Sequence, residues 1–484
     1  MSPNTYHLLP FRFRNLGNRY LLVSENGQFQ YLDRDDLCRL IHNELSPNEP
    51  LFNDLKSKDI ICLKYTAPLL KTLAAKYRTK KKHIFDSTAL HMMVLTYRCN
   101  QRCAYCHASS EDELVGALDM SVRTAQSCLN FAFESPSPYL KIEFQGGEPT
   151  LNFNTLKVSV EYGKALAERL DKKVEFVVCT NLYDLDDSKL AFLHENDVQV
   201  STSLDGPQKL HDSCRKSAFD GGSYNKFRNN LFRVRDKYDG ITPSALLTVS
   251  RHNLNRLDSV IDEYLNLGLN SIFIRMLNPF GRAHESWNDL CYDVGEFINA
   301  YLSALDYIID INKEGTFFVE EYAAILLRRI LTPYPCGFVD LQSPAGTATS
   351  GIIYDPDGDI FVSDEARMLK KAAGDKHFCL GNVTTHERSA VFQTDRLKQV
   401  VQASVIEAIP GCAWCAYQTY CGSDPVRNYH LFGDYISFKP NDPYCQLHKA
   451  IFDNLFNRLE AMDHATESVI WSWLTGISLD PAEE

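Results

Sequence analysis

The sequence predicts an α/β protein built around a partial (βα)6 barrel, with a small α+β domain before the barrel and a cysteine-rich domain after it. Three observations support this prediction. Strand-like and helix-like segments alternate from about residue 88 to 330, a hairpin signal lies near the N-terminus, and after about Thr332 the pattern breaks into loops and cysteines. At 484 residues the chain is too long for one ordinary domain. We expect domains at residues 1–86, 87–331 and 332–462, followed by an acidic tail at 463–484.

The N-terminal segment reads as a hairpin followed by helices. Strands are expected at Arg19–Ser24 and Gln28–Leu32, joined by a tight turn. Helices are expected at Arg34–Glu44 and about Leu51–Lys58, and the basic cluster Arg78–His83 reads as a linker. This order resembles the small winged-helix-like peptide-recognition domains that are fused to peptide-modifying enzymes. A purely structural cap is the alternative.

The barrel prediction rests on six short, apolar and partly β-branched runs, as expected for strands buried on both faces. They are Leu90–Thr96, Leu140–Gln145, Val174–Cys179, Val198–Leu204, Ala245–Ser250 and Ser271–Leu277. Amphipathic segments separate them, at Ser121–Glu134, Asn154–Lys172, Asp187–Glu195, Ser223–Tyr238 and Leu254–Leu267. Six βα units predict a parallel, partly closed barrel with right-handed crossovers. Functional residues are expected at the carboxyl ends of its strands.

Charge and cysteine usage restrict the function and the compartment. The formal net charge of −12 argues against a general nucleic-acid binder or an anionic-membrane binder. We expect no membrane span, because no apolar run approaches the roughly 20 residues that a span needs. The first residues lack the shape of a signal peptide. Fifteen cysteines, several at metal-ligand spacing, make disulfides improbable and indicate a reducing cytoplasm.

Three cysteines directly after the first barrel strand are the strongest signal in the chain. Cys99, Cys103 and Cys106 have the spacing at which three thiolates hold three irons of a cubane and leave the fourth iron open. A zinc knuckle or a redox pair is the alternative. The motif, with Tyr105 before the last thiol, resembles the radical S-adenosylmethionine (SAM) superfamily. The resemblance implies a [4Fe-4S] cluster that reduces SAM to a deoxyadenosyl radical, which then takes a hydrogen from the substrate.

Further motifs at the ends of later strands resemble the SAM pocket of that superfamily. Strand two is followed by Gln145-Gly146-Gly147-Glu148-Pro149, a motif that the resemblance assigns to the amino group of SAM, and glycines there allow close backbone approach. Asn181 after strand three is expected at the ribose. Ser203 and Arg215 are implied for the carboxylate, which suits a hydroxyl and a guanidinium fork. The alternative is that these are turn residues and a surface charge.

A second cysteine set lies near the C-terminus. Cys412, Cys415, Cys421 and Cys445 resemble the distal ligand set of the SPASM extension, which implies an auxiliary [4Fe-4S] cluster. Zinc is the structural alternative for four such thiols.

The proximal cluster of that extension lacks its usual ligands. Pro425 and Ser363 stand where cysteines are expected, and only Cys336 and Cys379 remain as candidate ligands. We therefore predict one auxiliary cluster. Asp364 keeps the place of the aspartate that acts as a base in sulfatase-maturing relatives, so we assign it a tentative role as base, with a surface ion pair as the alternative.

Beyond its motifs, the chain resembles the B-type radical SAM maturase of the His-Xaa-Ser repeat-peptide system. The stretches at residues 9–14, 335–344 and 363–368 carry this closer resemblance. It implies a ribosomally made substrate with His-Xaa-Ser repeats, a second maturase of the C type, and reduced flavodoxin or ferredoxin as electron donor. The alternatives are an anaerobic, formylglycine-generating sulfatase maturase and a non-catalytic peptide-binding scaffold.

Overall fold

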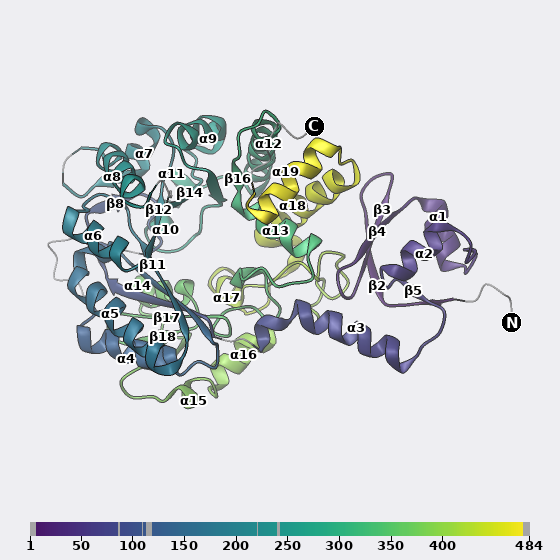
Figure 1. Cartoon of the computed structure of the whole chain (residues 1–484), viewed down its shortest axis with the longest axis horizontal. Helices are drawn as coiled ribbons and strands as arrows, with labels where there is room; N and C mark the ends of the chain where they lie inside the picture. The colour runs from purple at the N-terminus through teal and green to yellow at the C-terminus, as the bar shows by residue number, and fades with distance from the viewer. Residues whose placement is uncertain are drawn as a thin grey trace.

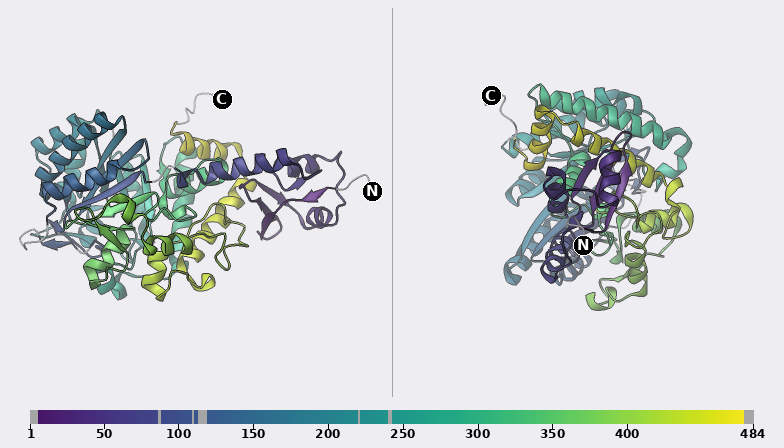
Figure 2. Two further views of the ribbon diagram at one scale, coloured as in Figure 1. Left: turned by 90° about the horizontal axis from the view of Figure 1, so that it is seen from below. Right: turned by 90° about the vertical axis from the view of Figure 1, so that its right-hand side faces the viewer.

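The computed structural model describes residues 6–85, 88–108, 110–112, 119–219, 221–239 and 243–477. Figure 1 shows the barrel and the N-terminal unit at opposite ends, with the C-terminal helices between them. The left view of Figure 2 shows that this arrangement makes the molecule elongated. Within the described ranges, no helix is both long enough and apolar enough to cross a membrane.

The six predicted barrel strands are confirmed and run parallel in chain order. They are β6 (Leu90–Thr96), β10 (Tyr139–Gly146), β11 (Lys173–Cys179), β12 (Val198–Ser203), β14 (Ser244–Thr248) and β15 (Ser271–Arg275). The helices between them lie on the outer side of the sheet (Figure 1): α4 (Val122–Phe133), α5 (Phe153–Leu170), α6 (Asp187–Glu195), α8 (Tyr224–Lys237) and α9 (Leu257–Asn266). Apolar side chains from both layers form one continuous core. The carboxyl ends of the strands therefore meet at one edge of the barrel.

The sheet continues beyond the predicted barrel at both ends. β16 (Val319–Glu320) pairs parallel with β15, between α12 (Val294–Lys313) and α13 (Glu321–Leu331). At the other end β17 (Gly351–Tyr354) pairs parallel with β6, and β18 (Asp359–Phe361) and β19 (Cys379–Asn382) follow antiparallel. These three strands come from the region expected to be mainly loops, so residues 351–382 complete the barrel sheet and do not form a separate layer.

The N-terminal unit contains the predicted hairpin and two helices, with additional elements. β3 (Tyr20–Ser24) pairs with β2 (Phe11–Asn15) and β4 (Phe29–Leu32), β1 (His7–Leu8) pairs with β5 (Ile61–Cys62), and α1 (Arg34–Ile41) and α2 (Pro50–Ser57) follow the hairpin. The unit packs on the C-terminal helices, where the Tyr31 hydroxyl donates to the Phe456 carbonyl at 2.6 Å.

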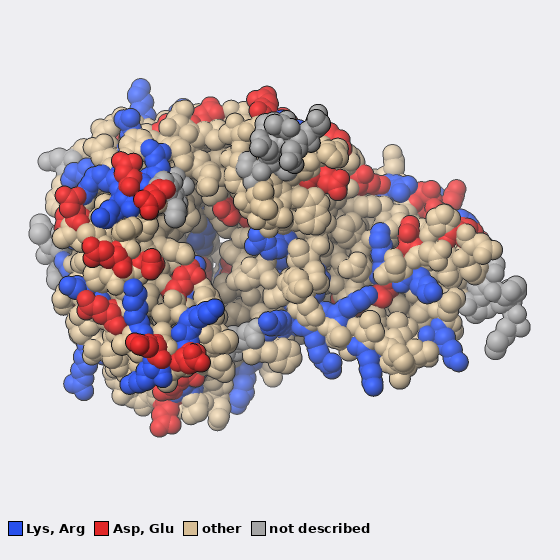
Figure 3. All heavy atoms as spheres, viewed as in Figure 1, with Lys and Arg blue, Asp and Glu red and all other residues tan. Residues whose placement is uncertain are grey.

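The prediction of a linker at residues 78–83 is wrong. Its first residues end α3 (Ala67–Lys80), whose basic side chains gather along the lower edge of the face in Figure 3. Lys80 Nζ donates to the Arg329 carbonyl at 2.8 Å, and Lys81 forms an ion pair with Glu407. The basic residues therefore attach the N-terminal unit to the rest of the molecule.

The predicted acidic tail is wrong over residues 464–475. After α18 (Pro443–Glu460), the chain forms a further helix, α19 (His464–Thr475), with Val469, Ile470 and Trp473 buried in the main core. Trp473 is 4% exposed, whereas Trp471 on the opposite side of the helix is 46% exposed. Residues 478–484 lie outside the described part of the chain.

Candidate functional site

One cavity of about 320 Å³ lies at the carboxyl ends of the barrel strands, and we call it the cofactor cavity. The cysteine loop forms one wall of it with Cys99, Cys103 and Cys106. The other predicted residues that line it are Tyr105, Gln145, Gly146, Gly147, Asn181, Ser203, Arg215 and Asp364. The structure thus brings the predicted cluster loop, the predicted SAM pocket and the tentative base to a single site.

The paired glycines make this site possible by their small size. A Cβ on Gly146 would lie 2.2 Å from the Thr96 carbonyl oxygen, and a Cβ on Gly147 would lie 2.2 Å from that of Arg98. Gly146 also has a φ of +145°, which L side chains rarely adopt. Any larger residue would push the end of β10 away from the start of the cysteine loop.

The structure corrects the role predicted for Glu148. Its side chain is 1% exposed and is absent from the cavity lining. The carboxylate accepts hydrogen bonds from the Thr180 hydroxyl and the Asn181 amide, both at 2.8 Å, and from the Thr150 hydroxyl at 2.6 Å. Burial raises the pKa of Glu148, while these hydrogen bonds oppose the shift. Glu148 therefore holds the loop that presents Asn181 and does not itself face the cavity.

The Tyr105 side chain lies between the carboxylate of Asp205 and the guanidinium of Arg215. Its hydroxyl donates to the Asp205 carboxylate at 2.6 Å and accepts from Arg215 Nη1 at 2.8 Å. Asp205 is fully buried, and burial raises its pKa to about 6 although Arg215 opposes the shift. The motif at residues 203–207 is thus more than a turn, because its aspartate fixes the tyrosine and the arginine of the cavity wall.

The donor set fits an iron–sulfur cluster with SAM. Three thiols line one wall, and the buried Arg215 Nε, Asn100 Nδ2 and Gln101 Nε2 atoms have no hydrogen-bond partner within the described chain. Unpaired buried polar atoms are costly, so a polar ligand is expected to complete this wall. Cys99, Cys103 and Cys106 would hold the cluster, and Asn181, Ser203 and Arg215 would face SAM.

Asp364 is held by a residue that the sequence reasoning did not single out. Arg367, one helical turn later on α14 (Asp364–Ala373), reaches Asp364 Oδ1 from Nε and from Nη2, each at 2.8 Å. Arg367 is 1% exposed and also lines the cofactor cavity. The i, i+3 spacing of an acid and an arginine predicts such a pair, but spacing alone does not place it in a cavity. The surface ion pair considered for Asp364 is therefore a partly buried one on the cavity wall.

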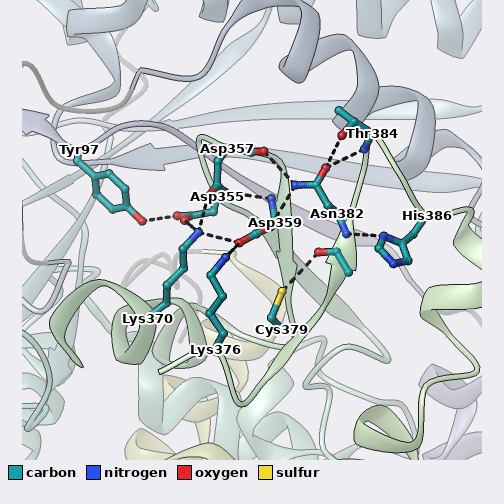
Figure 4. A network of polar contacts seen from close by, with 11 residues as sticks. Tyr97, Asp355, Asp357, Asp359, Lys370, Lys376, Cys379, Asn382, Thr384 and His386 are labelled. Atoms are coloured by element: carbon teal, nitrogen blue, oxygen red, sulfur yellow. Dashed lines mark hydrogen bonds and ion pairs between the residues drawn. The ribbon is translucent and has the colours of Figure 1, made fainter. Parts of the chain in front are cut away.

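A polar network connects the cysteine loop to the β17–β18 hairpin (Figure 4). The Tyr97 hydroxyl donates to Asp355, whose other oxygen accepts from Lys370 Nζ at 2.6 Å. Lys370 also contacts Asp357 at 2.7 Å and Asp359 at 2.9 Å. One ammonium thus bridges three carboxylates of the hairpin next to the segment that carries the predicted cluster ligands, and Lys376 Nζ also contacts Asp359 at 2.7 Å.

The second cysteine set also meets in one place. Cys412, Cys415, Cys421 and Cys445 line a single small cavity together with Lys439 and Lys449. The two lysines lower the pKa of Cys412 against the larger effect of burial, which raises it to about 11. Four thiols beside two cations suit a cluster with four protein ligands, since the ligands must be thiolates.

The positions that the resemblance reserves for proximal ligands have other tasks. Ser363 caps α14, where its hydroxyl accepts from the Ala366 amide at 3.3 Å, and Pro425 begins α17 (Pro425–Phe432). Cys379 lies on β19 and donates to the Gly381 carbonyl at 3.4 Å.

Among the residues that the structure describes, no group of three or more His, Cys, Asp or Glu side chains converges closely enough for a single metal ion.

Comparisons with known sequences agree with this geometry. The sequence model described as the radical SAM superfamily matches residues 93–263. The chain is 22% identical over 386 residues to a cysteine-type anaerobic sulfatase-maturating enzyme of Clostridium novyi, which covers 75% of this chain and 93% of that enzyme. It is 25% identical over 318 residues to the sporulation killing factor maturation protein SkfB of Bacillus subtilis, covering 62% and 71%.

Two solved structures share the fold. Native anSMEcpe with bound AdoMet and Kp18Cys peptide superposes with a TM-score of 0.65 at 19% identity and covers 78% of this chain and 99% of that chain. Streptococcus suis SuiB bound to its precursor peptide SuiA superposes with a TM-score of 0.51 at 13% identity, over 91% and 100%. Both superpositions extend well beyond residues 93–263.

Proposed function

We propose that this chain, a radical SAM enzyme through its domain at residues 93–263, modifies a ribosomally made peptide that contains His-Xaa-Ser repeats. The observation that carries the proposal is the cofactor cavity, where three thiols face the residues expected to bind SAM. When bound, a [4Fe-4S] cluster and SAM supply a deoxyadenosyl radical that abstracts hydrogen from the substrate. The protein contributes orientation of SAM and substrate and exclusion of solvent.

The coarser class is well supported. The chain is a radical SAM maturase of the sulfatase-maturase or peptide-modifying type, and this excludes the non-catalytic scaffold. Relatives of both types include proteins seen with bound peptides. The finer choice of His-Xaa-Ser repeats rests on the resemblance at residues 9–14, 335–344 and 363–368.

A sulfatase maturase is the second candidate, because sulfatase-maturating enzymes match most of the chain. The absence of cysteine at Ser363 and Pro425 argues against it. For Asp364 we propose the role of base, since its carboxylate lines the cofactor cavity. Arg367 holds that carboxylate in place, because its Nε and Nη2 atoms each lie 2.8 Å from Asp364 Oδ1.

The remaining assignments complete the proposal. We propose the N-terminal unit (residues 1–86) as the peptide-recognition part, a C-type maturase as partner, and reduced flavodoxin or ferredoxin as electron donor. The reducing cytoplasm is the proposed compartment, because cluster ligation requires free thiols.

The test is anaerobic co-expression with a His-Xaa-Ser repeat peptide, followed by intact mass and fragmentation of the peptide. A mass change or cross-linked fragment that disappears in the Cys99→Ala/Cys103→Ala/Cys106→Ala variant supports the proposal. Asp364→Asn should retain SAM cleavage and lose product. An unmodified peptide alongside deoxyadenosine formation would favour the sulfatase-type substrate, which is then tested with a sulfatase peptide.

A further inference from the structure

Two more cavities lie in series beyond the cofactor cavity. The second, of about 260 Å³, shares Leu246 and Arg275 with the cofactor cavity. The third, of about 790 Å³, shares Met276, Leu277 and Arg427 with the second. Shared walls place the second cavity between the site of SAM and a larger space lined by Trp287, Tyr292 and His430. A substrate segment that reaches the cofactor cavity by this path must occupy the second cavity.

The second cavity combines aromatic walls with carboxyl groups. Tyr322, Phe338 and Tyr444 supply the rings, and Asp340, Glu365 and Asp424 supply the acids. Aromatic faces and carboxylates together are the usual surroundings of a bound organic cation.

The two arginines of this cavity do not balance its acids. Arg275 Nη2 lies 3.7 Å from Glu365, and Arg427 Nη1 lies 3.2 Å from the separate acid Asp442. Asp424 accepts the Val426 and Arg427 amides, each at 3.0 Å, as the cap of α17. For the Asp340 carboxyl, no hydrogen bond is found within the described residues. Burial and neighbouring acids raise the pKa of Asp340 to about 6 and that of Glu365 to about 8, although Arg275 opposes both shifts.

An independent observation indicates a polar ligand in the cofactor cavity, on the wall that contains Arg275. Arg367 is 1% exposed, lines the cofactor cavity together with Arg275, and its Nη1 atom has no hydrogen-bond partner within the described residues. A buried guanidinium N–H without an acceptor is costly. A peptide carbonyl oxygen of a bound segment is an acceptor that satisfies it.

Two of these acids are neighbours in sequence of the positions that lack a proximal cluster ligand. Glu365 lies two residues after Ser363, and Asp424 directly precedes Pro425. Two acids of the second cavity are therefore close in sequence to the positions where the resemblance expects cysteine ligands.

We propose that the second cavity is a substrate subsite for a cationic side chain (lysine, arginine or protonated histidine) of the peptide being modified. Asp340 and Glu365 provide the counter-charge, the three rings enclose the side chain, and a backbone carbonyl of the same segment accepts from Arg367. This inference rests on the proposed function, because it names the chemistry that the maturase recognises in its peptide.

The test measures binding separately from turnover. Holoenzyme with SAM is titrated anaerobically with three dye-labelled peptides that differ at one residue (lysine, norleucine or glutamate). The variants are Asp340→Asn, Glu365→Gln and, as control, Asp262→Asn at an exposed acid outside all three cavities. The lysine peptide should bind at least tenfold tighter than the norleucine peptide, and the glutamate peptide should bind weakest. Asp340→Asn should reduce the lysine preference to under threefold, and Asp262→Asn should leave it unchanged.

Affinities within threefold for all three peptides on the wild-type enzyme would overturn the subsite. So would a lysine preference that survives both Asp340→Asn and Glu365→Gln, provided their iron content and deoxyadenosine formation match the wild type. A lysine preference that depends on Asp340, in an enzyme that leaves His-Xaa-Ser peptides unmodified, would support the subsite while rejecting the proposed substrate. Modified His-Xaa-Ser peptides without any charge preference would do the reverse.

Discussion

The hydroxyl of Tyr97 donates a hydrogen bond to the carboxylate of Asp355, across 258 positions of sequence. Tyr97 lies two residues before the first predicted cluster ligand, and Asp355 begins the turn between β17 and β18. Both side chains are buried, at 3% and 1% exposure. The position of the cysteine loop therefore depends on a hairpin encoded far downstream.

Replacing Tyr97 by phenylalanine should destabilise the fold by about 1–3 kcal/mol, because one buried oxygen of Asp355 loses its donor. The measurement is anaerobic urea unfolding. Tyr162→Phe is the matched control, since its hydroxyl bonds to Asn130 at 2.8 Å in an exposed setting. Equal losses in the two variants would argue against a special role of the Tyr97 bond.

Iron content should distinguish the two cysteine sets. We expect about eight irons per chain in the wild type, since each cubane holds four. Loss of Cys99, Cys103 and Cys106 should remove about four, and loss of Cys412, Cys415 and Cys421 should remove another four. Cys38→Ser, at an exposed cysteine, is the control. About twelve irons in the wild type would contradict the single auxiliary cluster, and about four with bound zinc would favour the zinc alternative.

Stability should fall as pH rises from about 4.5 to 7 because of Glu320. Its carboxyl group is fully buried and accepts from the Tyr301 hydroxyl and the Ala323 amide, both at 2.6 Å, yet burial raises its pKa to about 7. The protonated Glu320 makes its full stabilising contribution below the unfolded pKa of about 4.3. This contribution is lost as pH rises through the folded pKa, and above that pH Glu320 no longer changes the free energy of unfolding. The rise in pKa from about 4.3 to about 7 corresponds to roughly 3–4 kcal/mol of stability.

Glu320→Gln should flatten this part of the pH profile, because glutamine does not ionise. Urea unfolding of the wild type and the variant between pH 5 and 8 compares the slopes. Parallel profiles would assign the pH dependence to other buried acids.

Helix α19 should contribute to the stability of the main core. Trp473→Ala should cost about 3–5 kcal/mol, as expected for removing a buried aromatic side chain. Trp471→Ala, on the exposed side of the same helix, should change the free energy of unfolding by less than about 0.5 kcal/mol. Thermal and urea unfolding of the two variants check this. Equally small effects of both substitutions would show that residues 464–475 do not stabilise the core.

The barrel was predictable from sequence because its strands are buried on both faces. β6 was predicted at Leu90–Thr96 and α6 at Asp187–Glu195, and both match the structure residue for residue. The location of the site was also predictable, because the carboxyl ends of parallel strands meet at one edge of the sheet and bring the residues that follow them together. Helix α3 was missed. None of its residues is fully buried, and the contacts that hold it include Lys76 with Asp59 and Lys80 with the Arg329 carbonyl, which apolar periodicity does not reveal.

The orientation of individual side chains at the site could not be predicted, because it depends on tertiary contacts. Glu148 lies beside two glycines of the cavity wall, yet its side chain turns toward Thr180 and Asn181, a choice that depends on tertiary contacts. Arg367 was part of a matching stretch, but its burial depends on the β17–β18 hairpin. The run Gly351–Tyr354 was short enough to pass for a loop, and only its pairing with β6 shows that it is a strand.

That pairing has a practical meaning for protein engineering. A fragment ending near residue 331 would retain all six barrel strands but leave β6, the strand that leads into the cysteine loop, as an open edge. Open edges invite self-association, and the same cut would remove Asp364, Arg367 and Asp355. The barrel is thus not a transplantable module, and chimeras that exchange C-terminal regions between related chains should place their junctions so that residues 351–382 stay with the barrel.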